Sequence, residues 1–166
     1  MSKQPLRLTL NGEPVEMWVW PHQTLLEVLR DELGASEVKY GCGEGVCGTC
    51  TVLLDGESVN ACTVFAVQVF GREISTVKGL MGEDEVLHPL QRHFIENDAS
   101  QCGFCTAGML LTAVELVRDR PAASREEIRR GLSGNLCRCT GYTKILDAVE
   151  AYASELRAGE PRRNEP

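Results

Sequence analysis

The sequence predicts a small α+β unit followed by an all-α unit, and three observations support this fold class. Apolar residues alternate with polar ones through the first half, which is typical of half-buried strands. Capping signals and helically spaced apolar residues dominate the second half, which is typical of a helical bundle. The eight cysteines divide four and four between the halves. Aromatic residues make up only 5% of the chain, so we expect something besides an apolar core to stabilise each unit.

The first unit is expected to begin with a hairpin and a helix. Residues 6–10 and 15–19 alternate apolar and polar side chains, and Asn11-Gly12 between them is a hairpin turn. Thr24 and Glu27 form a capping box that opens a helix with apolar residues as far as Leu33, and Gly34 ends it.

Further short strands are expected after a glycine-rich loop. The loop, GCGEGVCGTC, spans residues 41–50, and an apolar strand is predicted over 51–54. Asp55-Gly56 is a tight turn before a returning strand over 57–61, and the last strand is predicted over 73–77. The α+β unit is therefore expected to end near Lys78.

Four helices are predicted in the second half. Pro121 ends the second of them, and Ser124 with Glu127 forms a capping box for the third. The predicted helices span residues 88–97, 106–118, 125–132 and 142–157. The expected organisation is an α+β domain at 1–78, a linker at 79–86, a helical domain at 87–158 and a disordered tail at 159–166.

Charge and hydropathy exclude several classes of protein. The net charge is −7, from 17 basic and 24 acidic residues, which argues against nucleic acid or an anionic membrane as the main partner. No apolar run approaches the roughly eighteen residues that span a bilayer, and the N-terminus has no apolar signal segment. We expect a cytoplasmic protein, and in that reducing compartment eight cysteines indicate metal or redox chemistry rather than disulfides.

The first four cysteines have the spacing of a plant-type ferredoxin. Cys42, Cys47, Cys50 and Cys62 give C-x4-C-x2-C-x11-C, of which the first two intervals are typical of a 2Fe–2S cluster. Glycines in the loop permit the positive φ angles with which the backbone curls around a cluster, and they let N–H groups approach its sulfurs. These glycines are Gly41, Gly43, Gly45 and Gly48. Structural zinc and buried free cysteines are the alternatives, but structural zinc usually takes closely paired cysteines.

The second four cysteines form two close pairs. Cys102 and Cys105 belong to a CGFC sequence, and Cys137 and Cys139 to a CRC sequence. Each pair lies just before a predicted helix, so two helix N-termini with free N–H groups are expected at one place. That environment suits a negatively charged, all-thiolate cluster. A pair with one intervening residue is unusual for structural zinc, although this spacing by itself leaves zinc open.

Three motifs, in order along the chain, resemble those of one family. They are GCGEGVCGTCTVLLDG, QCGFCTAGM and LSGNLCRCTGY. With them the chain resembles the small iron–sulfur subunit of the molybdenum hydroxylases, which include xanthine dehydrogenase, aldehyde oxidoreductase and carbon monoxide dehydrogenase. The resemblance covers Leu6 to Leu156. It implies a β-grasp, ferredoxin-like domain followed by a four-helix bundle, with one 2Fe–2S cluster in each.

The resemblance also implies which partner each cysteine group faces. Cys42, Cys47, Cys50 and Cys62 would bind the cluster nearer the FAD of one partner subunit. Cys102, Cys105, Cys137 and Cys139 would bind the cluster nearer the molybdopterin of another, with Gln101 and Cys139 beside that cofactor. The chain would relay electrons within a hetero-oligomer, either a heterotrimer or a dimer of heterotrimers. Electrons would flow toward FAD, or in the reverse direction in a reductase of the family.

One residue departs from the family's pattern, and two tryptophans lie outside the three motifs. The family commonly has proline where this chain has Ala107, so we expect a slightly looser helix entry and no loss of the cluster. Trp18 and Trp20 fall on the outer face of the second strand. They are expected either to contact a partner or to be covered by another part of this chain.

No residue is assigned to substrate chemistry. The sequence has no dinucleotide-binding glycine fingerprint, P-loop or nucleophile elbow. Its three histidines lie outside the cysteine motifs. We therefore expect the iron–sulfur subunit of a multi-subunit oxidoreductase. The alternatives are a zinc-stapled interaction module with two four-cysteine sites and an iron–sulfur regulator, although the acidic charge disfavours a DNA-reading surface.

Overall fold

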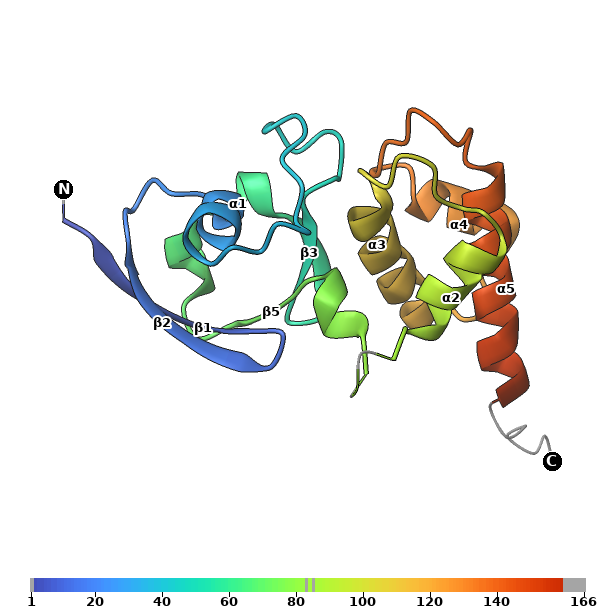
Figure 1. Cartoon of the computed structure of the whole chain (residues 1–166), viewed down its shortest axis with the longest axis horizontal. Coiled ribbons are helices and arrows are strands. Elements are labelled where there is room, and N and C mark those ends of the chain that lie inside the picture. Colours follow the sequence, from blue (N-terminus) through green and yellow to red (C-terminus); the bar gives the residue numbers. More distant parts are fainter. Residues whose placement is uncertain (1, 83, 85, 160–166) are drawn as a thin grey trace.

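The computed structural model describes residues 2–82, 84 and 86–159. A part that contains a sheet, at the left of Figure 1, lies beside a helical part at the right. This order confirms the predicted fold class of an α+β domain followed by an all-α domain. Within the described ranges, no helix is both long and apolar enough to cross a bilayer.

Among the described residues, five strands form one mixed sheet in the order β2-β1-β5-β3-β4. β1 pairs antiparallel with β2 and parallel with β5, and β5 pairs antiparallel with β3. The last strand thus inserts between the two hairpins, which is the β-grasp arrangement. The bounds are β1 (Gln4–Leu10), β2 (Glu13–Val19), β3 (Thr51–Leu54), β4 (Glu57–Asn60) and β5 (Glu73–Ser75).

Both predicted hairpin turns are confirmed. Asn11 and Gly12 have φ angles of 51° and 85°, and Asp55 and Gly56 have φ angles of 50° and 87°. Two successive left-handed residues are the requirement of a type I′ turn, which asparagine or aspartate followed by glycine meets at least cost. The second turn places β4 so that the chain returns toward the glycine-rich loop.

The predicted first helix is present, but its second half has π geometry. α1 (Leu25–Glu27) begins at the predicted capping box, where Glu27 N donates to Thr24 Oγ1 at 3.2 Å and Thr24 N donates to Glu27 Oε2 at 2.7 Å. Val28–Glu32 then forms a π-helix, in which Leu33 N donates to Val28 O. The helical leucines and valine pack with Leu6 and Ile74 in one apolar core against the sheet.

The helical part has its own core. Its helices are α2 (Pro89–Glu96), α3 (Thr106–Asp119), α4 (Arg125–Gly131) and α5 (Thr143–Gly159). The predicted capping box of α4 is confirmed, since Ser124 N donates to Glu127 Oε2 at 2.8 Å and Glu127 N donates to Ser124 Oγ at 3.4 Å. Buried Met109, Ile128 and Val149 join three of these helices. The predicted tail begins at Gly159, which ends α5, and otherwise lies outside the described residues.

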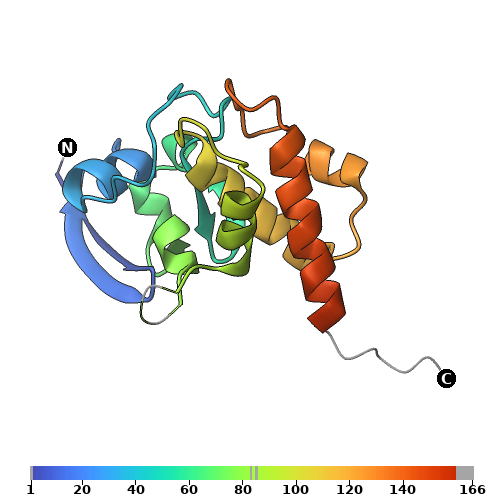
Figure 2. The ribbon, with the colours of Figure 1, turned by 45° about the vertical axis from the view of Figure 1, so that its right-hand side comes forward.

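The two parts meet along α3. This helix lies against β3, as Figures 1 and 2 both show. At its C-terminal end, Arg118 Nη1 donates to Gly56 O in the β3–β4 turn at 2.9 Å. Val77 and Leu80, in a 3-10 segment before the helical part, pack against the helical core. The loops that carry cysteines lie beyond the other end of α3, at the top of Figure 1.

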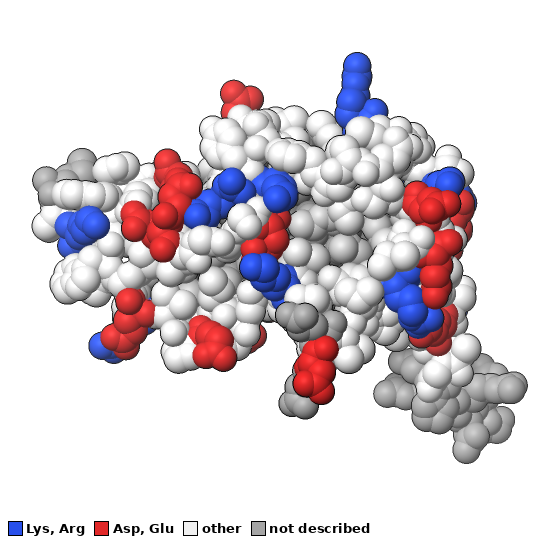
Figure 3. All heavy atoms as spheres, viewed as in Figure 1, with Lys and Arg blue, Asp and Glu red and all other residues white. Residues whose placement is uncertain are grey.

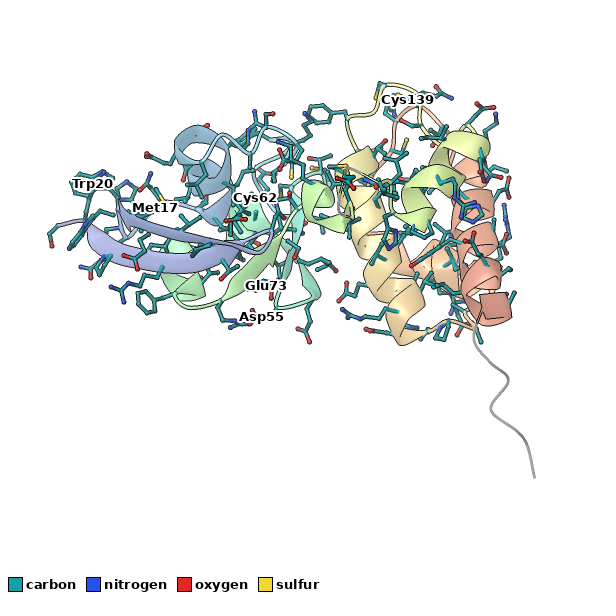
Figure 4. The ribbon with its side chains drawn as sticks, turned by 60° about the horizontal axis from the view of Figure 1, so that its bottom comes forward. Met17, Trp20, Asp55, Cys62, Glu73 and Cys139 are labelled. Atoms are coloured by element: carbon teal, nitrogen blue, oxygen red, sulfur yellow. The ribbon has the colours of Figure 1, made fainter. Side chains whose placement is uncertain are left out.

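Two tryptophans are partly exposed at the outer edge of the sheet. β2 is an edge strand, and Figure 4 shows Trp20 and Met17 at the end of the molecule farthest from the helical part. Trp18 is 62% exposed and Trp20 is 39% exposed. Lys3 and His22 of this chain lie against the Trp20 ring, so the chain covers part of Trp20, and a partner contact of Trp18 stays a prediction.

Candidate iron–sulfur sites

The first four cysteines converge in the structure. Three of them lie on the loop before β3, and Cys62 lies in the 3-10 turn Ala61–Thr63 after β4. Cys42 N donates to Cys47 Sγ at 3.4 Å, and Gly45 N, on the same loop, donates to Cys62 Sγ at 3.2 Å. Burial, and after it the neighbouring Cys62 and Cys47 thiols, raises the pKa of Cys50. The spacing thus brings four thiols to one place.

Backbone N–H groups surround the exposed side of this site. Glu44 N and Val46 N donate to Cys42 Sγ at 3.3 and 3.4 Å, and Gly45 N donates to Cys62 Sγ at 3.2 Å. The N–H donors, that of Glu44 first, lower the pKa of Cys42 to about 6. The loop is therefore arranged to stabilise negative charge on sulfur, whether on a thiolate or on a cluster ligand.

The inner side of the site is buried. Cys50 and Cys62 belong to the core of the first part. Burial raises the pKa of the Cys50 thiol to about 12. Such a thiol gives up its proton at neutral pH only in exchange for a bound cation, so this donor set suits a metal centre better than a reactive cysteine.

The loop glycines act in two ways. Gly43, Gly45 and Gly48 have φ angles of 74°, 73° and 66°, which confirms the predicted positive φ. Gly41 does not have a positive φ, so the prediction of a positive φ at this glycine is wrong. A Cβ at Gly41 would lie 2.5 Å from Thr49 Oγ1 and 2.7 Å from Cys47 Sγ, so this glycine makes room for the loop to close.

The second four cysteines also converge. Cys139 Sγ lies 3.5 Å from Cys102 Sγ. Burial, and after it the neighbouring Cys137 thiol, raises the pKa of Cys105 to about 12. The Thr140 hydroxyl lies 3.0 Å from Cys137 Sγ. Cys105 and Cys137 are half-buried, whereas Cys102 and Cys139 face solvent.

Two helices begin at the second site, as predicted. Cys105 is the N-cap of α3, and α5 begins at Thr143, shortly after Cys139. Figure 1 shows both helices starting at the end of the bundle that carries these loops, and Figure 4 labels Cys139 there. The positive ends of two helix dipoles therefore lie at this group of four thiols, where they favour bound negative charge.

The donor sets fit diiron centres. A 2Fe–2S cluster takes four cysteine ligands. Each of the two places holds four thiols, and in the second Cys102 Sγ and Cys139 Sγ lie 3.5 Å apart. Backbone N–H groups aimed at Cys42 Sγ and Cys62 Sγ suit the negative charge that such a cluster carries.

Asn135 and Tyr142, which no sequence pattern indicated, connect the two sites. Asn135 is buried and donates to Gly48 O and Thr51 Oγ1. The Tyr142 hydroxyl accepts from Cys137 N at 2.8 Å. Both residues lie inside the LSGNLCRCTGY motif. The signal that could have found Asn135 is a side-chain amide two positions before a predicted cysteine ligand. The predicted Gln101 is exposed beside Cys102.

Comparison with known proteins decides between the expected classes. Residues 8–69 match the model of a 2Fe-2S iron-sulfur cluster binding domain, and residues 76–150 match that of a second 2Fe-2S binding domain. The nicotinate dehydrogenase small FeS subunit of Eubacterium barkeri is 46% identical over 93% of this chain and 98% of its own. The nicotine 6-hydroxylase small subunit of Paenarthrobacter nicotinovorans is 46% identical over 84% of this chain and 84% of its own.

This chain belongs to the small iron–sulfur subunits of the molybdenum hydroxylases. A chain of quinoline 2-oxidoreductase from Pseudomonas putida 86 has the same fold, with a TM-score of 0.89 and 45% identity over 97% of this chain and all of that one. The resemblance expected from the three motifs is confirmed. As a member of this family, the chain is part of an oxidoreductase, with two 2Fe–2S binding domains and a role in electron transfer.

Proposed function

We propose that this protein relays electrons, one at a time, between a molybdopterin-bearing catalytic subunit and an FAD-bearing subunit. Cys102, Cys105, Cys137 and Cys139 would hold the 2Fe–2S cluster that faces the molybdopterin. Cys42, Cys47, Cys50 and Cys62 would hold the cluster that faces FAD. The observation that carries this proposal is the gathering of the eight thiols into two groups of four.

A 2Fe–2S cluster takes up one electron and releases one electron, with no bond made to substrate. The two electrons released by oxidation of one substrate molecule on the catalytic subunit would therefore pass in two single steps. The polypeptide would hold each cluster, donate N–H groups to its sulfurs and exclude water from its inner side. The residues for the last two tasks are the loop from Gly43 to Val46 and the buried Cys50 and Cys62.

Exposed apolar side chains beside the cysteines support docking of partners at both sites. Phe104, between Cys102 and Cys105, is 46% exposed, and Leu136 beside Cys137 is 48% exposed. Tyr40 and Val46 are each 60% exposed beside the first site. The upper margin in Figure 3, which has the same view as Figure 1, is white over most of its length, with an acidic and a basic side chain projecting from it. Apolar surface beside a redox site is typical of an interface that keeps water away from the electron path.

We extend the proposal to the assembly. Gln101 and Cys139 would lie beside the molybdopterin, since both are exposed at the end of the helical part. The complex would be a heterotrimer or a dimer of heterotrimers, in the cytoplasm, where reducing conditions keep the thiols free for iron. We propose domain limits of 1–78 and 87–158, with a linker at 79–86 that folds partly against the helical core through Leu80.

Metal analysis of the purified full chain tests this function. We expect a red-brown protein with about four irons and four acid-labile sulfides per chain, and two distinct EPR signals on reduction. It should also copurify with larger flavin and molybdenum subunits. A colourless protein with two zincs would overturn the proposal in favour of the zinc-stapled interaction module. A protein that carries clusters, binds DNA and copurifies with no partner subunit would overturn it in favour of the iron–sulfur regulator.

A further inference from the structure

A short set of hydrogen bonds joins the loops that carry the two cysteine groups. Leu136 N donates to Cys47 O at 2.9 Å. Asn135 Nδ2 donates to Gly48 O at 3.0 Å and to Thr51 Oγ1 at 3.2 Å. The two loops lie side by side in Figures 1 and 2, the first in cyan and the second in orange-red. Residues more than eighty positions apart are thus tied together directly beside the cysteines.

Asn135 is connected to both sites. On one side its amide reaches Gly48, which follows Cys47. On the other side its backbone oxygen accepts a hydrogen bond from the Tyr142 hydroxyl at 3.2 Å, and that hydroxyl accepts from Cys137 N at 2.8 Å. Asn135 therefore holds the backbone next to one predicted ligand and, through Tyr142, the backbone of another.

The burial of Asn135 indicates that its hydrogen bonds matter. The residue is only 4% exposed. Burying a side-chain amide lowers the stability of the fold unless its N–H groups find acceptors. An apolar side chain of similar size would fill the same space without that requirement. Both Asn135 hydrogen bonds cross to the first part of the molecule. Such a directed donor, paired at two acceptors, fixes one arrangement of the two surfaces where apolar packing would permit several.

Close backbone contact makes that arrangement rigid. A Cβ at Gly48 would lie 2.4 Å from Gly134 O, and a Cβ at Gly108 would lie 2.2 Å from Gly48 O. Gly108 is in the first turn of α3, just after Cys105. Three segments therefore meet without side chains between them. The Asn135 amide lies at their meeting point, since its Nδ2 would be 2.7 Å from a Cβ at Gly48 and 3.2 Å from a Cβ at Gly108.

We propose that Asn135 is a positioning residue for electron transfer between the two clusters of this chain. The proposal rests on the function proposed above, in which both cysteine groups bind 2Fe–2S clusters. One electron passes from the reduced to the oxidised cluster, and no bond or proton changes. Asn135 sets the distance and orientation of the two loops across which that electron tunnels, and tunnelling becomes steeply slower as the distance grows.

The full chain with both clusters reduced gives a direct measure of this spacing, because the magnetic interaction between two reduced clusters splits their EPR signals and weakens with the cube of their distance. In Asn135→Asp the side chain keeps its shape, but the carboxylate has no N–H for Gly48 O. We expect the splitting to narrow or vanish while each cluster keeps its own signal. Asn135→Ala, which introduces no charge, should act in the same direction. Amide exchange of Leu136 should also lose protection, since its hydrogen bond to Cys47 O opens.

Arg118→Met provides the matched control. It removes another hydrogen bond between the two parts, from Arg118 Nη1 to Gly56 O, at the opposite end of α3. The splitting should be unchanged. The proposal is overturned if Arg118→Met narrows the splitting equally, or if both Asn135 variants leave it unchanged. Loss of a cluster from both Asn135 variants also overturns it, since Asn135 would then be needed for cluster binding. A wild-type chain without clusters contradicts the proposed function instead.

Discussion

The thiols within each cysteine group differ in environment. In the first group Cys42 receives several N–H donors, whereas Cys50 lies in the apolar core. In the second group Cys105 is partly buried, whereas Cys102 and Cys139 are exposed. Hydrogen bonding and burial are the two means by which a protein adjusts the potential of an iron–sulfur cluster. We therefore expect the two sites to have separate potentials and separable signals.

Serine substitution of one cysteine in each group should affect only its own site. Cys47→Ser should remove or change the EPR signal of the first cluster, and Cys137→Ser that of the second, because each thiolate is proposed to bind one of two independent diiron centres. EPR of the reduced proteins, with iron analysis, measures this. If both signals survive both substitutions unchanged, the proposed ligand sets are wrong.

Gly108→Ala should destabilise the protein although it replaces glycine by alanine inside a helix. Alanine normally gains roughly 1 kcal/mol of stability there. Here the new Cβ would lie 2.2 Å from Gly48 O, and overpacking of this kind costs about 1–3 kcal/mol. Denaturant unfolding gives the free energy.

Gly134→Ala is the control, because nothing lies within 4 Å of its added Cβ. Its stability should change by no more than about 0.5 kcal/mol. Equal stability of the Gly108→Ala protein and the wild type would show that the contact between the first turn of α3 and Gly48 relaxes without cost.

At the scale of elements, local signals predicted most of what the structure contains. The capping boxes at Thr24 and Ser124 are confirmed because both of their partners lie three residues away. The π geometry after Glu27 was not predicted. Arg30 there donates to Ser36 O and to Val38 O, which holds the following loop back against the helix. Those contacts depend on where the loop folds, and no residue pattern within the helix signals them.

The contact between α2 and α5 should make stability depend on pH. Glu155 on α5 accepts from His93 at 2.6 Å and from Arg92 at 2.7 Å, and these partners, His93 first, lower the pKa of Glu155 from its ordinary value of 4.5. A lowered carboxyl pKa contributes stability above pH 4.5, and that contribution is lost as the pH falls below this value.

Glu155→Gln should therefore be less stable than the wild type at neutral pH, and the difference should shrink as the pH falls below 4.5. Thermal unfolding of both proteins across this range measures it. Glu13→Gln, at an exposed carboxylate on β2 for which the described residues provide no ion pair, is the control. A difference between Glu155→Gln and the wild type that does not vary with pH would contradict the assigned pairing.

At the scale of the whole molecule, the sequence predicted both parts and all eight converging cysteines but not how the parts meet. Spacing and glycines carry the information for the first site, since three of its cysteines share one loop, and the second site is predicted from two cysteine pairs that each precede a helix. The hydrogen bonds from Leu136 to Cys47 and from Asn135 to Thr51 join distant segments. Only the packed arrangement of α3 against β3 brings these residues within reach, so no local pattern could predict them.

Assembly with the catalytic subunit should depend on Phe104. Phe104→Asp places a charge on an exposed apolar side chain next to Cys105, so it should weaken copurification with the molybdenum subunit while both cluster signals persist. Leu156→Asp makes the same kind of change on α5, far along the helix from the cysteine loops, and should leave assembly intact. Unimpaired assembly of the Phe104→Asp protein would place the interface elsewhere.

The unequal exposure of the sulfurs has a consequence before the complex forms. Cys50 and Cys62 are enclosed by the protein, but Cys102 and Cys139 face water. Dissolved oxygen or peroxide therefore reaches these two sulfurs most easily. Cys42 is vulnerable for a different reason, because its lowered pKa favours the thiolate, which is the form that is converted to sulfenic acid. A newly made chain is thus open to oxidation at both cysteine groups. A partner subunit that covered these loops would shield both groups from oxidants.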